Sequence, residues 1–220
     1  MISVMLALME GTMSPKHTID LVFSIIPVNR SGQAAAVVAK FLRYYENSAK
    51  GDWRNTITLV ADDIDDAGID ASIRLGVEVI ADAIKEKKPV FNVNKIYMDA
   101  YVQENSAVGE RYPSVNTAIT NAIEKGTLVF DYFGHGGEDG FTAERILDKT
   151  QIQSFNNPNT LPLLITSNCD FSRFNNPSRI TAGECTLWNE NGGAAYMITT
   201  TREIYISTGQ RFNKEFISML

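Results

Sequence analysis

The sequence predicts an α/β fold with three layers, in which helices cover both faces of a mostly parallel sheet. Short apolar runs typical of buried strands alternate along the chain with amphipathic helical patterns. The strand runs are continuously apolar rather than alternating, as expected for strands that are covered on both faces. The helical segments between them supply the crossover connections that parallel pairing requires.

The elements of the first half follow in chain order, each from a local pattern. The apolar residues 1–9 lack the basic region of a signal peptide, so we interpret them as a buried strand or a truncation boundary. Strands are expected where short apolar runs end at Pro27 or at polar residues: 21–26, 57–61 and 91–98. Helices are expected over 33–45 and 71–87, the second with Asp70 as its N-cap. The predicted apolar face of the first helix consists of Val37, Val38, Phe41, Leu42 and Tyr45.

The second half continues the alternation. Residues 99–112 are polar and are predicted to form a loop. Pro113 at a helix start and Gly126 after its end bracket a third helix. The remaining expected elements are strands at 127–133, 161–167 and 193–200 and helices at 182–190 and 210–220. No linker or internal repeat interrupts the pattern, so we expect one domain spanning residues 1–220.

Composition excludes several classes of protein. Hydrophobic residues make up 44% of the 220 residues and charged residues 21%, which is typical of a folded domain. The net charge of −6 disfavours a general nucleic-acid binder. No apolar run is long enough for a transmembrane helix, so no transmembrane segment is expected. Two cysteines cannot form a disulfide framework.

Polar residues with chemical potential follow three of the predicted strands. In an open parallel sheet, ligands bind beyond the carboxyl ends of the strands. Asp62 and Asp63 follow the strand at 57–61, His135 and Gly136 follow the strand at 127–133, and Cys169 follows the strand at 161–167. The sheet would therefore present a carboxylate, an imidazole and a thiol at one edge.

These residue types suit nucleophilic catalysis. A free thiol has a pKa of about 8.5 and needs a base to become a thiolate. His135 can take that proton, Gly136 can offer its N–H to an oxyanion, and Asp62 or Asp63 can orient the imidazole. The alternative for Cys169 is an inert buried thiol, which is the expectation for Cys185. A zinc site is disfavoured because His17, His135 and the two cysteines contain no closely spaced pair.

The acidic stretch from Asp62 to Asp70 leaves three interpretations open. Its glycine, Gly68, is out of place for an EF-hand loop, and the terminal glutamate is missing. It can be a solvated loop, Asp62 or Asp63 at its start can supply the carboxylate that orients the histidine, or it can form an irregular Ca²⁺ site. We therefore expect no catalytic cofactor or metal, while a structural calcium ion stays open.

The motif Gly134-His135-Gly136-Gly137, followed by LPLLITSNCDFSRF around Cys169, resembles the gingipain-type cysteine peptidases of family C25. The stretch NCDFSRFNNPSRITAGECTLWNENGGAAYMITTTREIYIS is similar to the PorU-like subgroup, the sortases or signal peptidases of the type IX secretion system of Bacteroidota. The resemblance covers about residues 19–220. One departure is LVFSIIP at 21–27, where the family has Gly-Arg before the proline.

The resemblance implies a caspase-like α/β sandwich and a Cys-His pair. Cys169 would be the nucleophile, His135 the base, and Gly136 and the Cys169 amide the oxyanion hole. The substrate would be a polypeptide, the C-terminal secretion signal of type IX cargo, with other type IX components as partners. The protein would act at the cell surface, associated with the outer membrane, or as a secreted protein. PorU-like proteins are far longer, so the chain is expected to be a fragment.

Other functions stay open at this point. Attack of the Cys169 thiolate on a peptide carbonyl would form a thioester. A general secreted gingipain-like protease would use water alone to resolve this thioester, whereas a sortase would also use an amine. A catalytically inactive caspase-like scaffold would bind a partner peptide. A Rossmann-type nucleotide binder is disfavoured, because no G-x-G-x-x-G motif follows the first strands. The residue preferred before the scissile bond does not follow from the sequence.

Overall fold

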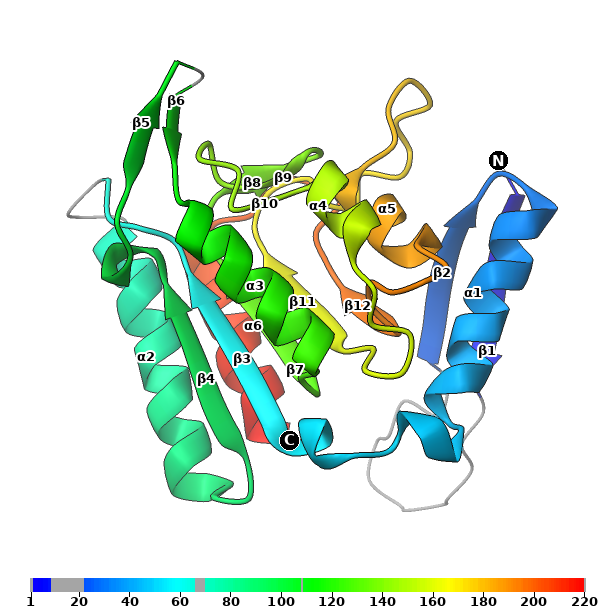
Figure 1. Ribbon diagram of the computed structural model, residues 1–220, viewed down its shortest axis with the longest axis horizontal. Coiled ribbons are helices and arrows are strands. Elements are labelled where there is room, and N and C mark those ends of the chain that lie inside the picture. The colour runs from blue at the N-terminus through cyan, green and yellow to red at the C-terminus, as the bar shows by residue number, and fades with distance from the viewer. Residues whose placement is uncertain (1, 9–21, 66–69, 108, 220) are drawn as a thin grey trace.

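The computed structural model describes residues 2–8, 22–65, 70–107 and 109–219. At its centre lies a five-stranded sheet with the strand order β12-β11-β7-β3-β4, in which every neighbouring pair is parallel (Figure 1). Its strands are β3 (Thr56–Ala61), β4 (Asn92–Tyr97), β7 (Val129–Phe133), β11 (Leu163–Ser167) and β12 (Tyr196–Ile198). The mostly parallel sheet expected from the sequence is confirmed.

Helices cover both faces of this sheet. Figure 1 shows α3 (Pro113–Lys125) in front of the strands and α2 (Asp70–Lys87) and α6 (Ile206–Met219) behind them. The helices α1 (Ser31–Tyr44), α4 (Lys149–Ser154) and α5 (Ala182–Trp188) lie toward the β12 side (Figure 1). The expected three-layer α/β architecture is therefore present.

The core is divided into two clusters, one for each face of the sheet. On one face Val115, Ile119 and Ile123 of α3 pack against Phe130 and Tyr132 of β7. On the other face the apolar residues of α2 pack against β3 and the opposite side of β7; they are Ile73, Val77, Ile80, Ile84, Ile57, Leu59, Ala61, Val129 and Phe133. Both faces of β7 are thus buried, which explains why four of its five residues are apolar or aromatic, with Asp131 as the exception.

The remaining strands form small antiparallel sheets. The strand β1 (Ile2–Leu8) pairs with β2 (Val22–Val28), so the apolar start of the chain is a strand. The strands β5 (Glu104–Ser106) and β6 (Gly109–Arg111) form a hairpin. A third sheet joins β8 (Gly136–Gly137), β9 (Gly140–Phe141) and β10 (Leu147–Asp148). Short 3₁₀ turns occur at Asn47–Ala49, Asp52–Asn55 and Met98–Ala100.

Some sequence predictions need correction. Residues 99–112 are not only a loop, because they contain the β5–β6 hairpin. The helix predicted to begin at residue 210 begins at Ile206, which packs on the core. The helix α4 and the sheet of β8, β9 and β10 were not predicted, because elements of two to six residues are too short to show a period. Leu21, predicted as a strand residue, lies outside the described residues.

The buried face of α1 also differs from the prediction. Val37 is buried and Phe41 packs beside it against β2 and α5, but Val38, Leu42 and Tyr45 are exposed. The place of these apolar residues in the interior is taken by Lys40, which is 2% exposed. The period of the helix was predicted correctly, but the stripe that faces the protein runs through Ala34, Val37, Lys40 and Phe41.

None of the described helices has the length and apolar character needed to cross a membrane.

Candidate active site

The carboxyl ends of three central strands lie level at one edge of the sheet. Phe133, the last residue of β7, pairs with Ala61 of β3 on one side and with Ser167 of β11 on the other. The backbone continues this alignment past the strands, since Asp62 N–H donates to the Phe133 carbonyl and Gly134 N–H donates to the Ser167 carbonyl. The segments that carry Asp62, His135 and Cys169 therefore start side by side (Figure 1).

The imidazole of His135 has a carboxylate partner. Its Nε2 lies 3.0 Å from Oδ1 of Asp70, the first residue of α2. The Asp70 side chain is 5% exposed, while the His135 side chain is 61% exposed. With Nε2–H donated to Asp70, the lone pair of the neutral ring is on Nδ1. The ring is thus fixed at one nitrogen and able to accept a proton at the other.

The two carboxylates predicted to orient the imidazole have other partners in the structure. Asp62 Oδ2 accepts the backbone N–H of His135 at 2.7 Å, so it holds the main chain and not the ring. Asp63 Oδ2 accepts the hydroxyl of Tyr112 at 2.8 Å. The sequence pattern predicts Asp70 only as the N-cap of a helix. No local pattern would have found its contact with His135, because it depends on how α2 begins across the sheet edge.

The charges around His135 favour its protonated form. Partial burial lowers the pKa of the imidazole, but the hydrogen bond to Asp70 and the negative charges of Asp62, Asp70 and Asp65 outweigh it, so the pKa is raised overall. An imidazolium formed during a reaction is therefore stabilised at this position.

Three buried carboxylates form a group next to the His135 backbone, which Asp62 contacts. Asp62, Asp63 and Glu144 each place an oxygen within 4.8 Å of the others, a spacing that can hold a metal ion. Burial raises the pKa of Asp62 to about 7, with a further rise from the charges of Asp63 and Glu144 and an opposing effect of the His135 N–H. At neutral pH, a proton on Asp62 therefore relieves part of the repulsion within this group.

The two glycines on either side of His135 allow a close approach of chain segments. A Cβ on Gly134 would lie 2.7 Å from Cβ of Asp62 and would also overlap the Tyr132 hydroxyl. A Cβ on Gly136 would overlap the Asn168 carboxamide and lie 2.8 Å from the Gly140 carbonyl. The motif therefore needs glycine at both positions for steric reasons.

Cys169 lies on a turn that directly follows β11. It is a free, partly buried cysteine, whereas Cys185 is buried in the core, where burial raises its pKa. Asp170 has a φ of 53°, in the left-handed region that a non-glycine residue rarely adopts. The turn is held by the segment after β12, through bonds from the Asp170 N–H to the Arg202 carbonyl and from the Ser172 N–H to the Thr200 carbonyl.

Unsatisfied polar groups concentrate near Cys169. Asn168 is 2% exposed, and neither its Nδ2 nor its Oδ1 has a hydrogen-bond partner among the described residues. Oδ1 of Asp170 and Oγ of Ser172 are also buried, and neither has a hydrogen-bond partner among the described residues. Buried polar atoms without partners are costly and are frequent at functional sites.

A cavity of about 610 Å³ lies beside this turn. It is lined by the segment that follows His135, from Gly137 to Thr150, and by Asp170 and Arg179 on the side of Cys169. The loop at 171–182 contributes Arg179 to this cavity, while no residue of 99–112 lines it. His17 lies outside the described residues.

Comparison with solved structures supports the expected fold. The chain is similar to gingipain R, the Arg-specific cysteine proteinase RgpB, with 16% identity and a TM-score of 0.66 over 87% of this chain. The complex of the Porphyromonas gingivalis RgpB pro- and mature domains gives the same values. Another protease structure has 16% identity and a TM-score of 0.60 over 82% of this chain. These likenesses confirm the gingipain-type, caspase-like fold.

The sequence comparisons give the family. The chain spans 44% of the length of the gingipain structures. No curated protein matches the sequence. The model of peptidase family C25 matches residues 4–220, which is nearly the whole chain. The chain therefore belongs to peptidase family C25, the cysteine peptidases of the gingipain type.

Proposed function

We propose that this chain contains the catalytic centre of a cysteine peptidase, with Cys169 as the nucleophile and His135 as the general base. The observation that carries the proposal is the imidazole of His135, fixed by a buried Asp70 at the sheet edge where Cys169 also lies. A base oriented by a third group is the arrangement that nucleophilic catalysis requires.

Each of these residues has a defined role in the proposed reaction. Nδ1 of His135 accepts the Cys169 proton, and the thiolate attacks the carbonyl carbon of the scissile peptide bond. The N–H groups of Gly136 and Cys169 donate to the resulting oxyanion. As the intermediate collapses to a thioester, His135 returns its proton to the leaving amine. Water then attacks the thioester, His135 takes a proton from it, and the Cys169 thiol is regenerated.

The carboxylates have separate roles in this proposal. Asp70 orients the imidazole and stabilises its protonated form, which agrees with the raised pKa of His135. Asp62 positions the His135 backbone, while Asp63 accepts the Tyr112 hydroxyl and donates its own N–H to Oδ1 of Asp62. The orienting role expected of Asp62 or Asp63 is thereby assigned to Asp70.

For the biological role, we propose a sortase or signal peptidase of the type IX secretion system. The support is the similarity of the sequence after Cys169 to the PorU-like subgroup. The substrate would be the C-terminal domain of secreted cargo, and an amine on a surface acceptor could resolve the thioester in place of water. The protein would act at the cell surface, with type IX components as partners.

Alkylation by iodoacetamide across pH 5 to 9 tests the catalytic pair. We expect Cys169 to react rapidly near neutral pH, and His135→Ala and Asp70→Asn to slow that reaction. Cys185 is the internal reference, because it is buried and burial raises its pKa. Cys169→Ala and Cys185→Ala variants identify which thiol is labelled. Equal, slow labelling of both cysteines with no effect of His135 would favour the inactive binding scaffold.

A cargo peptide with its C-terminal secretion domain, incubated with a small amine, tests the finer role. A product whose mass includes the amine indicates transfer. A product with only water added indicates the general gingipain-like protease, and no cleavage at the cargo junction contradicts the type IX role.

A further inference from the structure

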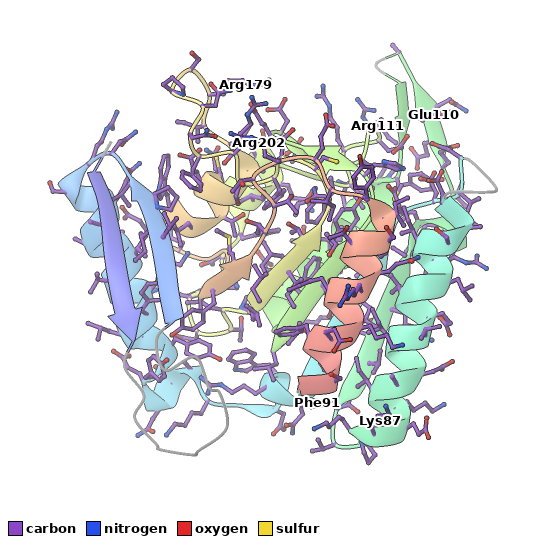
Figure 2. All side chains as sticks on the ribbon, turned by 180° about the vertical axis from the view of Figure 1, so that it is seen from behind. Lys87, Phe91, Glu110, Arg111, Arg179 and Arg202 are labelled. Carbon is purple, nitrogen blue, oxygen red and sulfur yellow. The ribbon has the colours of Figure 1, made fainter. Side chains whose placement is uncertain are left out.

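A second set of contacts joins the segment that carries His135 to the segment that follows Cys169. The two segments are 136–139 and 173–182, and they meet around one glutamate, Glu138. Both lie at the catalytic edge of the sheet, where Figure 2 labels Arg179 on the loop that extends beyond the strands. These contacts do not involve the imidazole, Asp70 or the thiol.

The carboxylate of Glu138 is surrounded by donors from the second segment. The Asn176 side-chain N–H₂ donates to both carboxylate oxygens, at 3.2 and 3.3 Å. Nε of Arg179 lies 3.3 Å from Oε2, and Nη1 of Arg173 lies 3.6 Å from Oε1. The Glu138 side chain is only 11% exposed, although both arginines are about half exposed. One largely shielded carboxylate thus contacts three side chains.

The main chain reinforces the connection. The carbonyl of Glu138 accepts the N–H of Ala182, the first residue of α5, at 2.8 Å. The neighbouring Asp139 forms ion pairs with Arg179 at 2.6 Å and with Lys149 at 2.5 Å, but its side chain is 64% exposed. Glu138 is therefore the protected member of the network and Asp139 the solvated one.

The second segment also has side-chain contacts outside the Glu138 group: Arg202 donates to Asn175 and Lys149 donates to the Ile180 carbonyl. Residues 173–181 contain no helix or strand, and Ile180 is 50% exposed. Arg173 is only four positions after Cys169, so the position of this segment is directly linked to that of the thiol. Arg179 also lines both the 610 Å³ cavity and a second cavity of about 470 Å³ on the other side of the segment, next to Trp188.

We propose that Glu138 is a positioning residue that sets the distance between His135 and Cys169 by clamping segment 173–182 to the histidine segment. This inference rests on the proposed peptidase function and adds a residue to it. Exposed ion pairs contribute little individually. A shielded carboxylate that gathers three donors is different, because its loss removes their common partner, although Arg179 keeps its ion pair with the exposed Asp139. The clamp also fixes Arg179 between the two cavities where a bound peptide would place its side chains.

The test compares Glu138→Gln with Glu78→Gln. The control makes the same substitution at Glu78 on α2, which accepts from Lys95 and from the Tyr97 hydroxyl, outside both clamped segments, and is 41% exposed. Three properties are measured: cleavage kinetics of a peptide, the pH profile of Cys169 alkylation, and amide hydrogen exchange of residues 171–182. Thermal melting shows whether both variants remain folded.

If Glu138 positions the pair, Glu138→Gln lowers kcat by about 10- to 100-fold with a smaller effect on KM, as expected for a misplacement on the order of 1 Å. Rapid alkylation of Cys169 shifts to higher pH, toward that of a free thiol. Exchange in 171–182 accelerates. Glu78→Gln changes none of these properties.

The proposal is overturned if alkylation, kcat and exchange in Glu138→Gln equal those of Glu78→Gln, or if they change only in proportion to a general loss of melting temperature. A failure of the catalytic assignment has a different signature. In that case His135→Ala leaves the rate of Cys169 alkylation equal to that of the unsubstituted chain. The exchange experiment still decides whether Glu138 holds segment 173–182.

Discussion

At the scale of single residues, the two consecutive glycines after His135 have different surroundings. A Cβ on Gly136 would overlap the Asn168 carboxamide and approach the Gly140 carbonyl, whereas a Cβ on Gly137 would meet nothing within 4 Å. We expect Gly136→Ala to lower the free energy of unfolding by about 1–3 kcal/mol, the usual cost of forcing extra atoms into a packed region. Gly137→Ala should remain within about 0.5 kcal/mol of the original chain. Urea unfolding of both variants measures this difference. Equal losses would mean that the Gly136 segment has freedom to move away from Asn168.

Some features of the candidate site could be predicted from the sequence, and others could not. Cys169, His135 and Gly136 could be placed at one edge of the sheet, because each follows a strand and the ends of parallel strands meet there. The contact of Asp70 with His135 could not be identified, because Asp70 begins a helix and reaches the imidazole only through the tertiary fold. The contacts of Glu138 depend in the same way on a segment far along the chain.

At the scale of elements, α1 and α5 are joined by a buried lysine. Nζ of Lys40 donates to the carbonyls of Thr186 and Leu187, in the last turn of α5, and no carboxylate accompanies it in the described contacts. Burial lowers the pKa of Lys40 to about 7, with a smaller contribution from the charge of Arg43. A lysine in an amphipathic helix is normally predicted on the exposed face, so this position could not be predicted from the period of α1.

The lowered pKa of Lys40 gives a pH dependence with a definite sign. Between pH of about 7 and 10.5 the unfolded chain binds the Lys40 proton and the folded chain does not, so this residue makes the free energy of unfolding rise with pH. Lys40→Met should flatten that rise. Urea unfolding from pH 6 to 10 measures it, with Lys50→Met as the control, because Lys50 is exposed on the surface. If the free energy of unfolding has the same pH dependence in the original chain and in Lys40→Met, the Lys40 amine is not neutral in the folded chain over this range.

At the scale of the whole molecule, the three layers bury both faces of the sheet, and the pattern of apolar runs was sufficient to predict this. The short hairpin β5–β6, the sheet of β8 to β10 and α4 were not predictable, because they are held by tertiary contacts and not by a local period. The three-layer arrangement also has an electrostatic consequence. A polar residue in the central strand β7 has no route to solvent on either side.

Asp131 is the polar residue of β7. Its burial in the sheet makes the free energy of unfolding depend on pH. It is 3% exposed, and its described partner is Nδ2 of Asn213 on α6, at 3.4 Å. Burial raises its pKa to about 7, while the Asn213 bond acts in the opposite direction. Between pH of about 4 and 7 the folded chain therefore holds a proton that the unfolded chain has lost, so the contribution of Asp131 to stability falls as pH rises.

Asp131→Asn replaces the carboxyl by a neutral group of the same shape and should remove this slope. The difference in unfolding free energy between variant and original chain should grow by a few kcal/mol from pH 5 to 8 in favour of the variant, since each pKa unit corresponds to about 1.4 kcal/mol. Asp139→Asn is the matched control: ion pairs with Lys149 and Arg179 lower the pKa of Asp139, so its effect lies at lower pH, outside the window. If both variants follow the original chain from pH 5 to 8, Asp131 is ionised in the folded sheet, and the closed three-layer interior must then stabilise a charge that burial alone would expel.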